Sequence, residues 1–137
     1  MMDIKVEFRS IPIAHYLYIR SECGLGTKTV EAALLGQGNS LCSVVAVDQK
    51  KKKTIGMGRI IGDLGCYCQI TDICVLPRYQ GSGIENIIMQ HLMDYIKLHV
   101  PETCYISYIA DGKAYQIGEE FGFKSTQPDG IGMFLIR

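Results

Sequence analysis

The sequence predicts an α/β fold of the mixed α+β kind, with a central mixed sheet of six to seven strands and about four helices. Short β-branched strands and amphipathic helices occur along the chain without strict alternation, which is typical of helices packed on both faces of a mixed sheet. Residues 84–100 place apolar side chains at spacings of three and four, the clearest helical pattern present. A strand that ends at Pro77 leads directly into this helix, which predicts a right-handed parallel crossover.

The first half of the chain predicts the order β-α-α-β-β. Pro12 can open the first helix, and Thr27 and Gly36 can cap the two ends of the second. Four lysines, Lys50 to Lys53, then form the turn of a hairpin, and a solvated turn explains such a run more simply than a binding patch does. The elements expected here are a strand at 4–8, helices at 13–19 and 28–35, and strands at 41–47 and 54–61.

The second half continues as β-α-β-α-β-β. Pro77 and Pro101 end the first strand and the long helix, because proline lacks a backbone N–H donor. Asp111 can cap a short helix, and Gln127 to Gly130 has the residues of a turn between two closing strands. The expected elements are strands at 67–76 and 105–110, helices at 84–100 and 111–121, and strands at 123–126 and 131–136. Without an internal linker or repeat, residues 1–137 are predicted to form a single domain.

Composition narrows the classes of function. The 14 basic residues balance the 14 acidic ones, so the formal net charge of zero favours neither a nucleic-acid partner nor a membrane surface. No apolar run approaches the roughly 20 residues that span a bilayer, and the first residues lack a signal core, so we expect a cytoplasmic protein. The six cysteines are expected to be free thiols, and no metal site is expected because their spacing does not suit one.

The stretch from Ile73 to Gly83 is the strongest functional signal. An apolar strand stops at Pro77, two glycines follow at 81 and 83, and a helix begins at Ile84. The first N–H groups of a helix have no internal partners, and glycines allow a close approach of the backbone to a phosphate. The stretch predicts an anion site, although an ordinary glycine-rich turn would have a similar sequence.

Two landmarks resemble the GCN5-related N-acetyltransferase (GNAT) family. Val75-x-Pro77-x-x-Gln80-Gly81-x-Gly83 is similar to the family's acyl-CoA signature, and residues 114–123, which end in Gly122-Phe123, are similar to its second landmark. The order of elements also matches over essentially the whole chain. The resemblance implies a GNAT fold in which the strand before the loop separates from its parallel neighbour and holds acetyl-CoA.

The resemblance also implies the cofactor-binding residues. Three residues of the strand would pair with pantetheine, and the backbone N–H of Val75 would hold the thioester oxygen. The loop and the first helical turn would bind the pyrophosphate. The strand residues are Ile73, Cys74 and Val75, and the loop residues are Gln80, Gly81, Ser82, Gly83, Ile84, Glu85 and Asn86.

Two positions depart from the family pattern. Glu85 stands where a small residue is usual, and its charge would oppose a pyrophosphate. Gly118 stands where many members carry the tyrosine that protonates the CoA thiolate; Tyr115, about one turn earlier, is the candidate acid, with a packed aromatic as the alternative. Asp72 is the candidate general base, with a hydrogen-bonded structural residue as the alternative.

The predicted function is an acetyl-CoA-dependent N-acetyltransferase. A primary amine of a small molecule or peptide would attack the thioester directly. The alternative is a non-catalytic CoA-binding or protein-interaction domain on the same fold, which Glu85 and Gly118 favour. Apolar faces on the last strands are compatible with a homodimer. No nucleic acid or membrane is expected as a partner.

Overall fold

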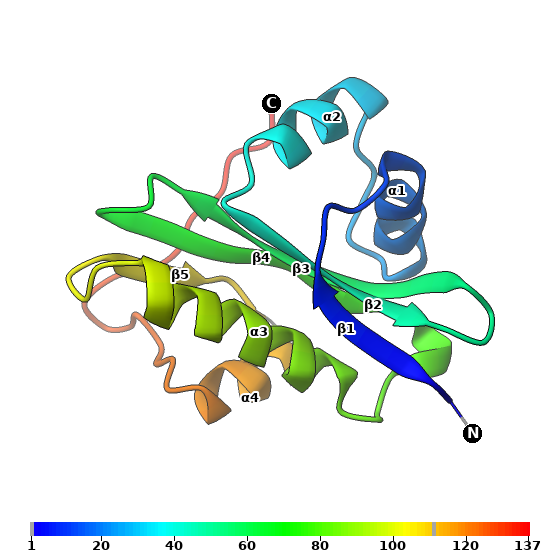
Figure 1. The fold of residues 1–137 in the computed structure, drawn as a ribbon. Coiled ribbons are helices and arrows are strands. Elements are labelled where there is room, and N and C mark those ends of the chain that lie inside the picture. Colours follow the sequence, from blue (N-terminus) through cyan, green and yellow to red (C-terminus); the bar gives the residue numbers. More distant parts are fainter. Residues whose placement is uncertain (1, 111) are drawn as a thin grey trace. The chain divides into compact units, whose positions relative to one another are not determined.

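The computed structural model describes residues 2–110 and 112–137 (Figure 1). The chain forms two compact units, residues 1–107 and 108–137, and each is described by itself. The first unit contains the sheet and three α-helices. The second contains one helix and the C-terminal segment.

The sheet has five strands in the order β1-β2-β3-β4-β5. Their bounds are β1 Ile4–Phe8, β2 Cys42–Asp48, β3 Lys53–Gly62, β4 Tyr67–Val75 and β5 Tyr105–Tyr108. The helices are α1 Ile13–Glu22, α2 Val30–Gly38, α3 Ile84–His99 and, in the second unit, α4 Lys113–Glu120; a 3₁₀ turn, η1, covers Pro77–Tyr79. No helix among the described residues is long and apolar enough to cross a bilayer.

The sheet lies between two helical layers. Helices α1 and α2 cover one face, and α3 covers the other (Figure 1). Successive residues of β3 face opposite helical layers. Gly58 faces Ile88 and Leu92 of α3. The next residue, Arg59, donates to the Gly36 carbonyl of α2. A Cβ on Gly58 would lie 2.8 Å from Cγ2 of Ile88, so glycine allows α3 to pack close to the sheet. The buried core includes Ile19, Val44, Val45, Ile55, Met57, Ile60, Ile70, Val75, Ile88, Met89 and Leu92.

Strand β4 combines two kinds of pairing and a bulge. It runs antiparallel to β3, and the register shifts between Met57 and Arg59, so that Asp72 lies in a bulge with a positive φ of 61°. On its other side, Tyr105 N–H donates to the Cys66 carbonyl, and the Ser107 hydroxyl reaches the Cys68 carbonyl. From the first contact to the second, the residue number increases by two on both strands, so β4 and β5 run in the same direction. The predicted mixed sheet with a parallel crossover through α3 is therefore confirmed.

Most predicted elements form, and the differences concern ends and edges. The second helix is capped by Thr29, not Thr27, since the Thr29 hydroxyl accepts from Ala32 N–H at 3.0 Å, and the helix continues past Gly36 to Gly38. The expected capping residue Asp111 lies outside the described residues.

The prediction of six to seven strands is wrong for the described chain, because neither closing strand forms. Residues 123–126 and 131–136 contain no strand, and the sheet ends at β5. The turn between them does form: Gly130 N–H donates to the Thr126 carbonyl at 2.8 Å, and the Thr126 hydroxyl donates back to the Gly130 carbonyl at 3.0 Å. Composition can favour a strand, but a strand also needs a partner edge for its backbone groups.

Candidate functional site

The loop between β4 and α3 has the geometry expected of an anion site. Gly81 and Gly83 both adopt a φ of +83°, a conformation that favours glycine, and nothing lies within 4 Å of where a Cβ would be placed. Gly83 is the N-cap of the 16-residue helix α3, and no side chain caps its first N–H groups. The loop therefore presents backbone donors and the positive end of a helix dipole together.

Val75 directs its backbone polar groups away from β3. It opposes Gly56 in the register, while Leu76 N–H donates to the Ile55 carbonyl at 2.8 Å. In an antiparallel ladder this pattern makes Val75 and Gly56 a non-hydrogen-bonded pair, so the N–H and carbonyl of Val75 face the β5 side of β4. That is the side on which the family resemblance places pantetheine.

The Val75 carbonyl already has two donors. Gln80 Nε2 donates to it at 3.0 Å, and the Cys23 thiol donates at 3.3 Å. Gln80 thus closes the loop back onto the strand, and Cys23, at the end of α1, lies beside the strand's last residue. Of the predicted strand residues, Cys74 and Val75 are buried and Ile73 is half-buried.

Sequence reasoning missed Cys23, because nothing in its own neighbourhood signals contact with a strand fifty residues later. A hydrogen bond with Cys74 lowers the pKa of the Cys23 thiol, although burial and the charges of Glu22 and Glu85 oppose this shift. The same hydrogen bond, with burial, raises the pKa of Cys74. The two thiols therefore influence each other's protonation beside the last residues of β4.

Glu85 has a side chain that is partly withdrawn from solvent. It is the second residue of α3, its side chain is half-buried, and its Oε1 atom is inaccessible to solvent. Its charge also acts on the Cys23 thiol. The carboxylate therefore lies near the end of α3 that the phosphates would approach. Asn86, the next residue, is half-buried as well.

A buried hydrogen bond anchors the loop to the sheet. The Tyr79 hydroxyl donates to Asp48 Oδ2 at 2.6 Å, and the Ser82 hydroxyl donates to the Tyr79 carbonyl at 2.7 Å. The Tyr79 hydrogen bond is the main reason that the pKa of Asp48 is below its usual value. In turn, it raises the pKa of Tyr79.

The Asp48 hydrogen bond predicts a specific dependence of stability on pH. A carboxyl with a depressed pKa contributes stability that is present above the unfolded-state pKa of about 3.9 and is lost as the pH falls through the folded-state value. We expect Tyr79→Phe to lower the free energy of unfolding at pH 7. The further decrease in this free energy as the pH falls should be smaller in the variant than in the wild type. Urea unfolding between pH 2 and pH 7 measures this; parallel curves for the two proteins would contradict it.

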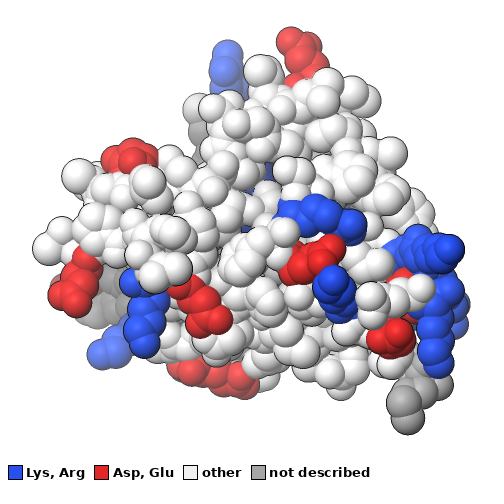
Figure 2. Space-filling model, in the orientation of Figure 1, with Lys and Arg blue, Asp and Glu red and all other residues white. Residues whose placement is uncertain are grey.

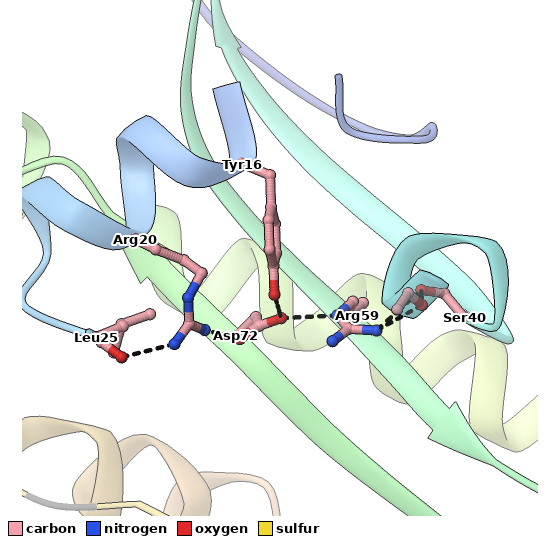
Figure 3. Close-up of polar contacts among 7 residues, drawn as sticks. Tyr16, Arg20, Leu25, Ser40, Arg59 and Asp72 are labelled. Atoms are coloured by element: carbon pink, nitrogen blue, oxygen red, sulfur yellow. Dashed lines mark hydrogen bonds and ion pairs between the residues drawn. The ribbon is translucent and has the colours of Figure 1, made fainter. Parts of the chain in front are cut away.

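Asp72 is the centre of a buried ion-pair network (Figure 3). Its Oδ2 accepts from the Tyr16 hydroxyl at 2.6 Å and from Arg59 Nε at 2.7 Å, and its Oδ1 accepts from Arg20 Nη1 at 2.6 Å. The exposed fractions of the Asp72, Arg20 and Arg59 side chains are 6%, 10% and 13%. Burial, with the Asp72 hydrogen bond, raises the pKa of Tyr16.

The two arginines extend this network to the neighbouring helices. Arg20 donates to the Leu25 carbonyl at 2.6 Å, and Arg59 donates to the Gly36 carbonyl at 3.1 Å and to the Ser40 hydroxyl at 3.2 Å (Figure 3). Asp72 thereby joins α1, α2 and β3 to the β4 bulge. No local pattern in the sequence indicates these partners, because they come from separate elements.

The second unit explains why position 118 is glycine. A Cβ there would lie 3.0 Å from Cε2 of Tyr108, so the Tyr108 ring occupies the space that a side chain would need. That ring also packs edge-on against Phe123, and its hydroxyl donates to the Ala114 carbonyl at 3.1 Å. Tyr115 lies on α4 with 44% of its surface exposed.

Lys50 to Lys52 lie in the turn between β2 and β3, Lys53 begins β3, and all four lysines are exposed. Figure 2 shows basic residues gathered at the hairpin end, while acidic and basic residues are interspersed elsewhere on this face. Within residues 2–110 and 112–137, no three His, Cys, Asp or Glu side chains form a group that could hold a metal ion.

Solved structures of known proteins share this fold. Protein SA2161 from meticillin-resistant Staphylococcus aureus, described as a probable acetyltransferase of unknown function, is 41% identical, with a TM-score of 0.92 over 98% of this chain and 100% of that one. The GNAT family protein SP0256 from Streptococcus pneumoniae is 22% identical, with a TM-score of 0.80 over 98% of both chains, a likeness of fold alone.

Curated N-acetyltransferases are similar to this chain over part of its length. GCN5-related N-acetyltransferase 2, chloroplastic, of Arabidopsis thaliana is 33% identical over 63% of this chain and 33% of its own length. The uncharacterized N-acetyltransferase ycf52 of Gracilaria tenuistipitata var. liui is 31% identical over 62% of this chain and 46% of its own. The chain thus spans less than half the length of these two curated relatives. The family model of the acetyltransferase (GNAT) domain matches residues 26–133, and with the fold and loop above, this shows that the chain belongs to the GNAT acetyltransferase family.

Proposed function

We propose that this chain is an acetyl-CoA-dependent N-acetyltransferase that acts on a primary amine of a small molecule or peptide. The observation that carries the proposal is the continuity of Val75 with the glycine loop: an outward-facing N–H at the end of β4 is followed by the uncapped N-terminus of α3. The Val75 N–H suits a thioester oxygen, and the N-terminus of α3 suits a pyrophosphate. The residues proposed to hold acetyl-CoA are Ile73, Cys74, Val75, Gln80, Gly81, Ser82, Gly83, Ile84, Glu85 and Asn86.

The proposed reaction is a direct transfer. The neutral amine attacks the thioester carbonyl carbon, a C–N bond forms, and the C–S bond breaks. The Val75 N–H donates to the oxygen as negative charge develops there. The amine loses a proton, and the CoA thiolate gains one. Tyr115 is the proposed acid for the thiolate, a role that rests on the family resemblance, and its loss would cost about 10²–10⁴-fold in rate.

Asp72 was expected to be the general base, and its environment favours a positioning role. The Asp72 carboxylate is buried and already accepts three hydrogen bonds, two of them from guanidinium groups, which leaves about one of its four lone-pair sites for an amine. We propose that Asp72 holds the β4 bulge in register with α1 and β3, and thereby sets the direction of the Val75 N–H.

Acetyl-CoA titration by calorimetry tests cofactor binding. Gly83→Ala is expected to weaken binding about tenfold or more, because its Cβ stands in the loop that the phosphates approach. Gly26→Ala is a matched control: Gly26 has a φ of +85° and open space around it, so both variants carry similar backbone strain. Equal effects on binding in the two variants, or no binding to the wild type, would contradict the proposal.

Release of free CoA thiol across a panel of amines tests catalysis. Thiol release that depends on one amine class supports the transferase. Tight acetyl-CoA binding without thiol release from any amine would favour the alternative, a non-catalytic CoA-binding or protein-interaction domain. That alternative remains relevant because Gly118 leaves the usual acid position empty of a side chain.

Other properties stay predictions. A cytoplasmic location is predicted from the sequence alone, and two of the relatives are named as chloroplastic. The single domain over residues 1–137 and the homodimer are likewise predictions.

A further inference from the structure

A cleft lies beside the N-terminus of α1, outside the loop that is proposed to bind acetyl-CoA. Its volume is about 470 Å³, and a second hollow of about 220 Å³ shares His15, Lys52 and Thr54 with it. The walls come from the residues after β1, the first turn of α1 and the β2–β3 hairpin. Every residue that lines the two hollows belongs to the first unit, so both are properties of that unit by itself.

The charge in the cleft is positive. Arg9 and Lys52 line the larger hollow, and Lys52 and Lys53 line the smaller one, at the hairpin end where Figure 2 shows basic residues gathered. Among the described residues, no carboxylate side chain lines either hollow. Arg9 has an acidic neighbour outside the cleft, Glu7, whose Oε1 lies 3.6 Å from Arg9 Nε. The Lys53 ammonium lies 5.5 Å from the centre of the Tyr18 ring. An anion in the cleft therefore meets three cationic side chains.

The acid of the hairpin itself is engaged elsewhere. Asp48 accepts from the backbone N–H groups of Lys50 and Lys51 through Oδ1 and from the Tyr79 hydroxyl through Oδ2. Its residue is 3% exposed. Asp48 thus fixes the shape of the hairpin that presents Lys52 and Lys53.

Neutral groups in the cleft add hydrogen-bonding capacity. Thr54 is 7% exposed, and its Oγ1 lies 3.1 Å from Nδ1 of His15, a hydrogen bond that fixes the orientation of the imidazole ring. Helix α1 begins at Ile13, no side chain caps its first N–H groups, and its first turn contains no acidic residue. The positive end of the helix dipole therefore adds to the cationic side chains. Pro12 and Val47 give the larger hollow an apolar wall.

Lys52 has a backbone conformation that usually belongs to glycine. Its φ is +52°, and in hairpin turns such a φ favours glycine or asparagine because a larger side chain crowds the backbone. The Lys52 side chain nevertheless lines both hollows. Residues held in strained conformations cluster at binding sites, where the ligand and not the fold requires them. At this position lysine is therefore worse than glycine for folding and better for an anion.

We propose that this cleft binds a phosphomonoester, the dianionic phosphate group of a small molecule, at a site separate from the glycine loop. Arg9, Lys52 and Lys53 neutralise the charge, and the first N–H groups of α1 donate to the phosphate oxygens. The volume of about 470 Å³ is within the usual range of small-molecule sites. A nucleic acid fits less well, because 14 basic and 14 acidic residues leave no net positive charge. This inference goes beyond the proposed acetyl transfer and does not depend on it.

An NMR titration of the ¹⁵N-labelled full chain with phenyl phosphate tests the site. At about pH 7.5 the probe is mostly dianionic, because the second pKa of a phosphate ester is about 6. We expect a dissociation constant of about 1 mM or lower, with amide shifts at Arg9, His15, Lys52 and Thr54. Benzenesulfonate, which has the same ring and a single charge, should bind about tenfold more weakly. Shifts confined to residues 81–86, no saturation below about 20 mM, or equal affinity for the sulfonate would overturn the proposal.

Lys52→Gly and Lys51→Gly form a matched pair of variants. Both lose one positive charge from the same exposed turn, but of the two lysines only Lys52 lines the cleft. Lys52→Gly is expected to raise the dissociation constant about fivefold or more and to raise the melting temperature by about 3 °C, because glycine relieves the strained φ. Lys51→Gly should keep the dissociation constant within about twofold of the wild type. Equal weakening by the two variants would mean that the lysine run attracts anions without forming a site.

Competition with CoA identifies the source of the phosphate. Phenyl phosphate that still binds in the cleft when CoA is saturating supports a separate site. Displacement of the probe by CoA would overturn the proposal, because the cleft would then belong to the cofactor site, and a repeat with 3′-dephospho-CoA shows whether the 3′-phosphate is the group that occupies it. A chain that binds phenyl phosphate in the cleft but binds no CoA would contradict the proposed transferase and leave this site standing, so the two failures are distinguishable.

Discussion

Asp72→Ala is expected to lower the free energy of unfolding by about 3–5 kcal/mol, the usual cost of breaking a buried ion pair from one side. The substitution leaves two guanidinium groups, each about nine-tenths buried, without their shared carboxylate. It also removes the acceptor of the Tyr16 hydroxyl. Urea unfolding at pH 7 measures the loss, and Asp94→Ala, which removes an exposed carboxylate from α3, should change stability by less than about 0.5 kcal/mol.

A second variant tests whether Asp72→Ala loses stability through unpaired buried charges or through lost packing. Replacing Arg20, Arg59 and Asp72 together by Met, Met and Leu removes the unpaired charges and should recover much of the stability that Asp72→Ala loses. If Asp72 were a general base instead, Asp72→Ala would keep wild-type stability while turnover fell and its pH profile changed. That result would reject the structural role.

The parts of the fold that depend on local sequence could be predicted. Prolines at 77 and 101 end their elements as expected, and the apolar spacing of residues 84–99 identifies α3. The loop with Gly81 and Gly83 could also be recognised, because a positive φ favours glycine and leaves a signature in the sequence.

Features that depend on distant partners could not be predicted. The side-chain partners of Asp72 described above are 13 to 56 residues away in the sequence, and they meet Asp72 only because α1 and β3 cross β4 at this point. Cys23 reaches Val75 for the same reason. The segment 131–136 has the composition of a strand, but a strand also needs a partner edge, which composition alone does not reveal.

Glu85→Gln is expected to tighten acetyl-CoA binding about 5–30-fold, or roughly 1–2 kcal/mol. The change keeps the size of the side chain and removes a negative charge from the first turn of α3, where the phosphates approach. In the empty protein the same charge interacts favourably with the helix dipole, so the variant should also lose about 0.3–1 kcal/mol of unfolding free energy. The two effects have opposite signs because the helix dipole attracts the carboxylate, whereas the carboxylate repels a bound pyrophosphate.

Glu31→Gln is the matched control for that competition, since Glu31 also lies in a first helical turn, that of α2, away from the glycine loop. It should lose a similar amount of stability and leave acetyl-CoA binding unchanged. Calorimetry at two salt concentrations is a further test. The difference in acetyl-CoA affinity between Glu85→Gln and the wild type should be smaller at high salt, because salt screens the repulsion that the substitution removes. Unchanged or weaker binding in Glu85→Gln would mean that the carboxylate does not oppose the phosphates, and that the departure at position 85 has no bearing on cofactor binding.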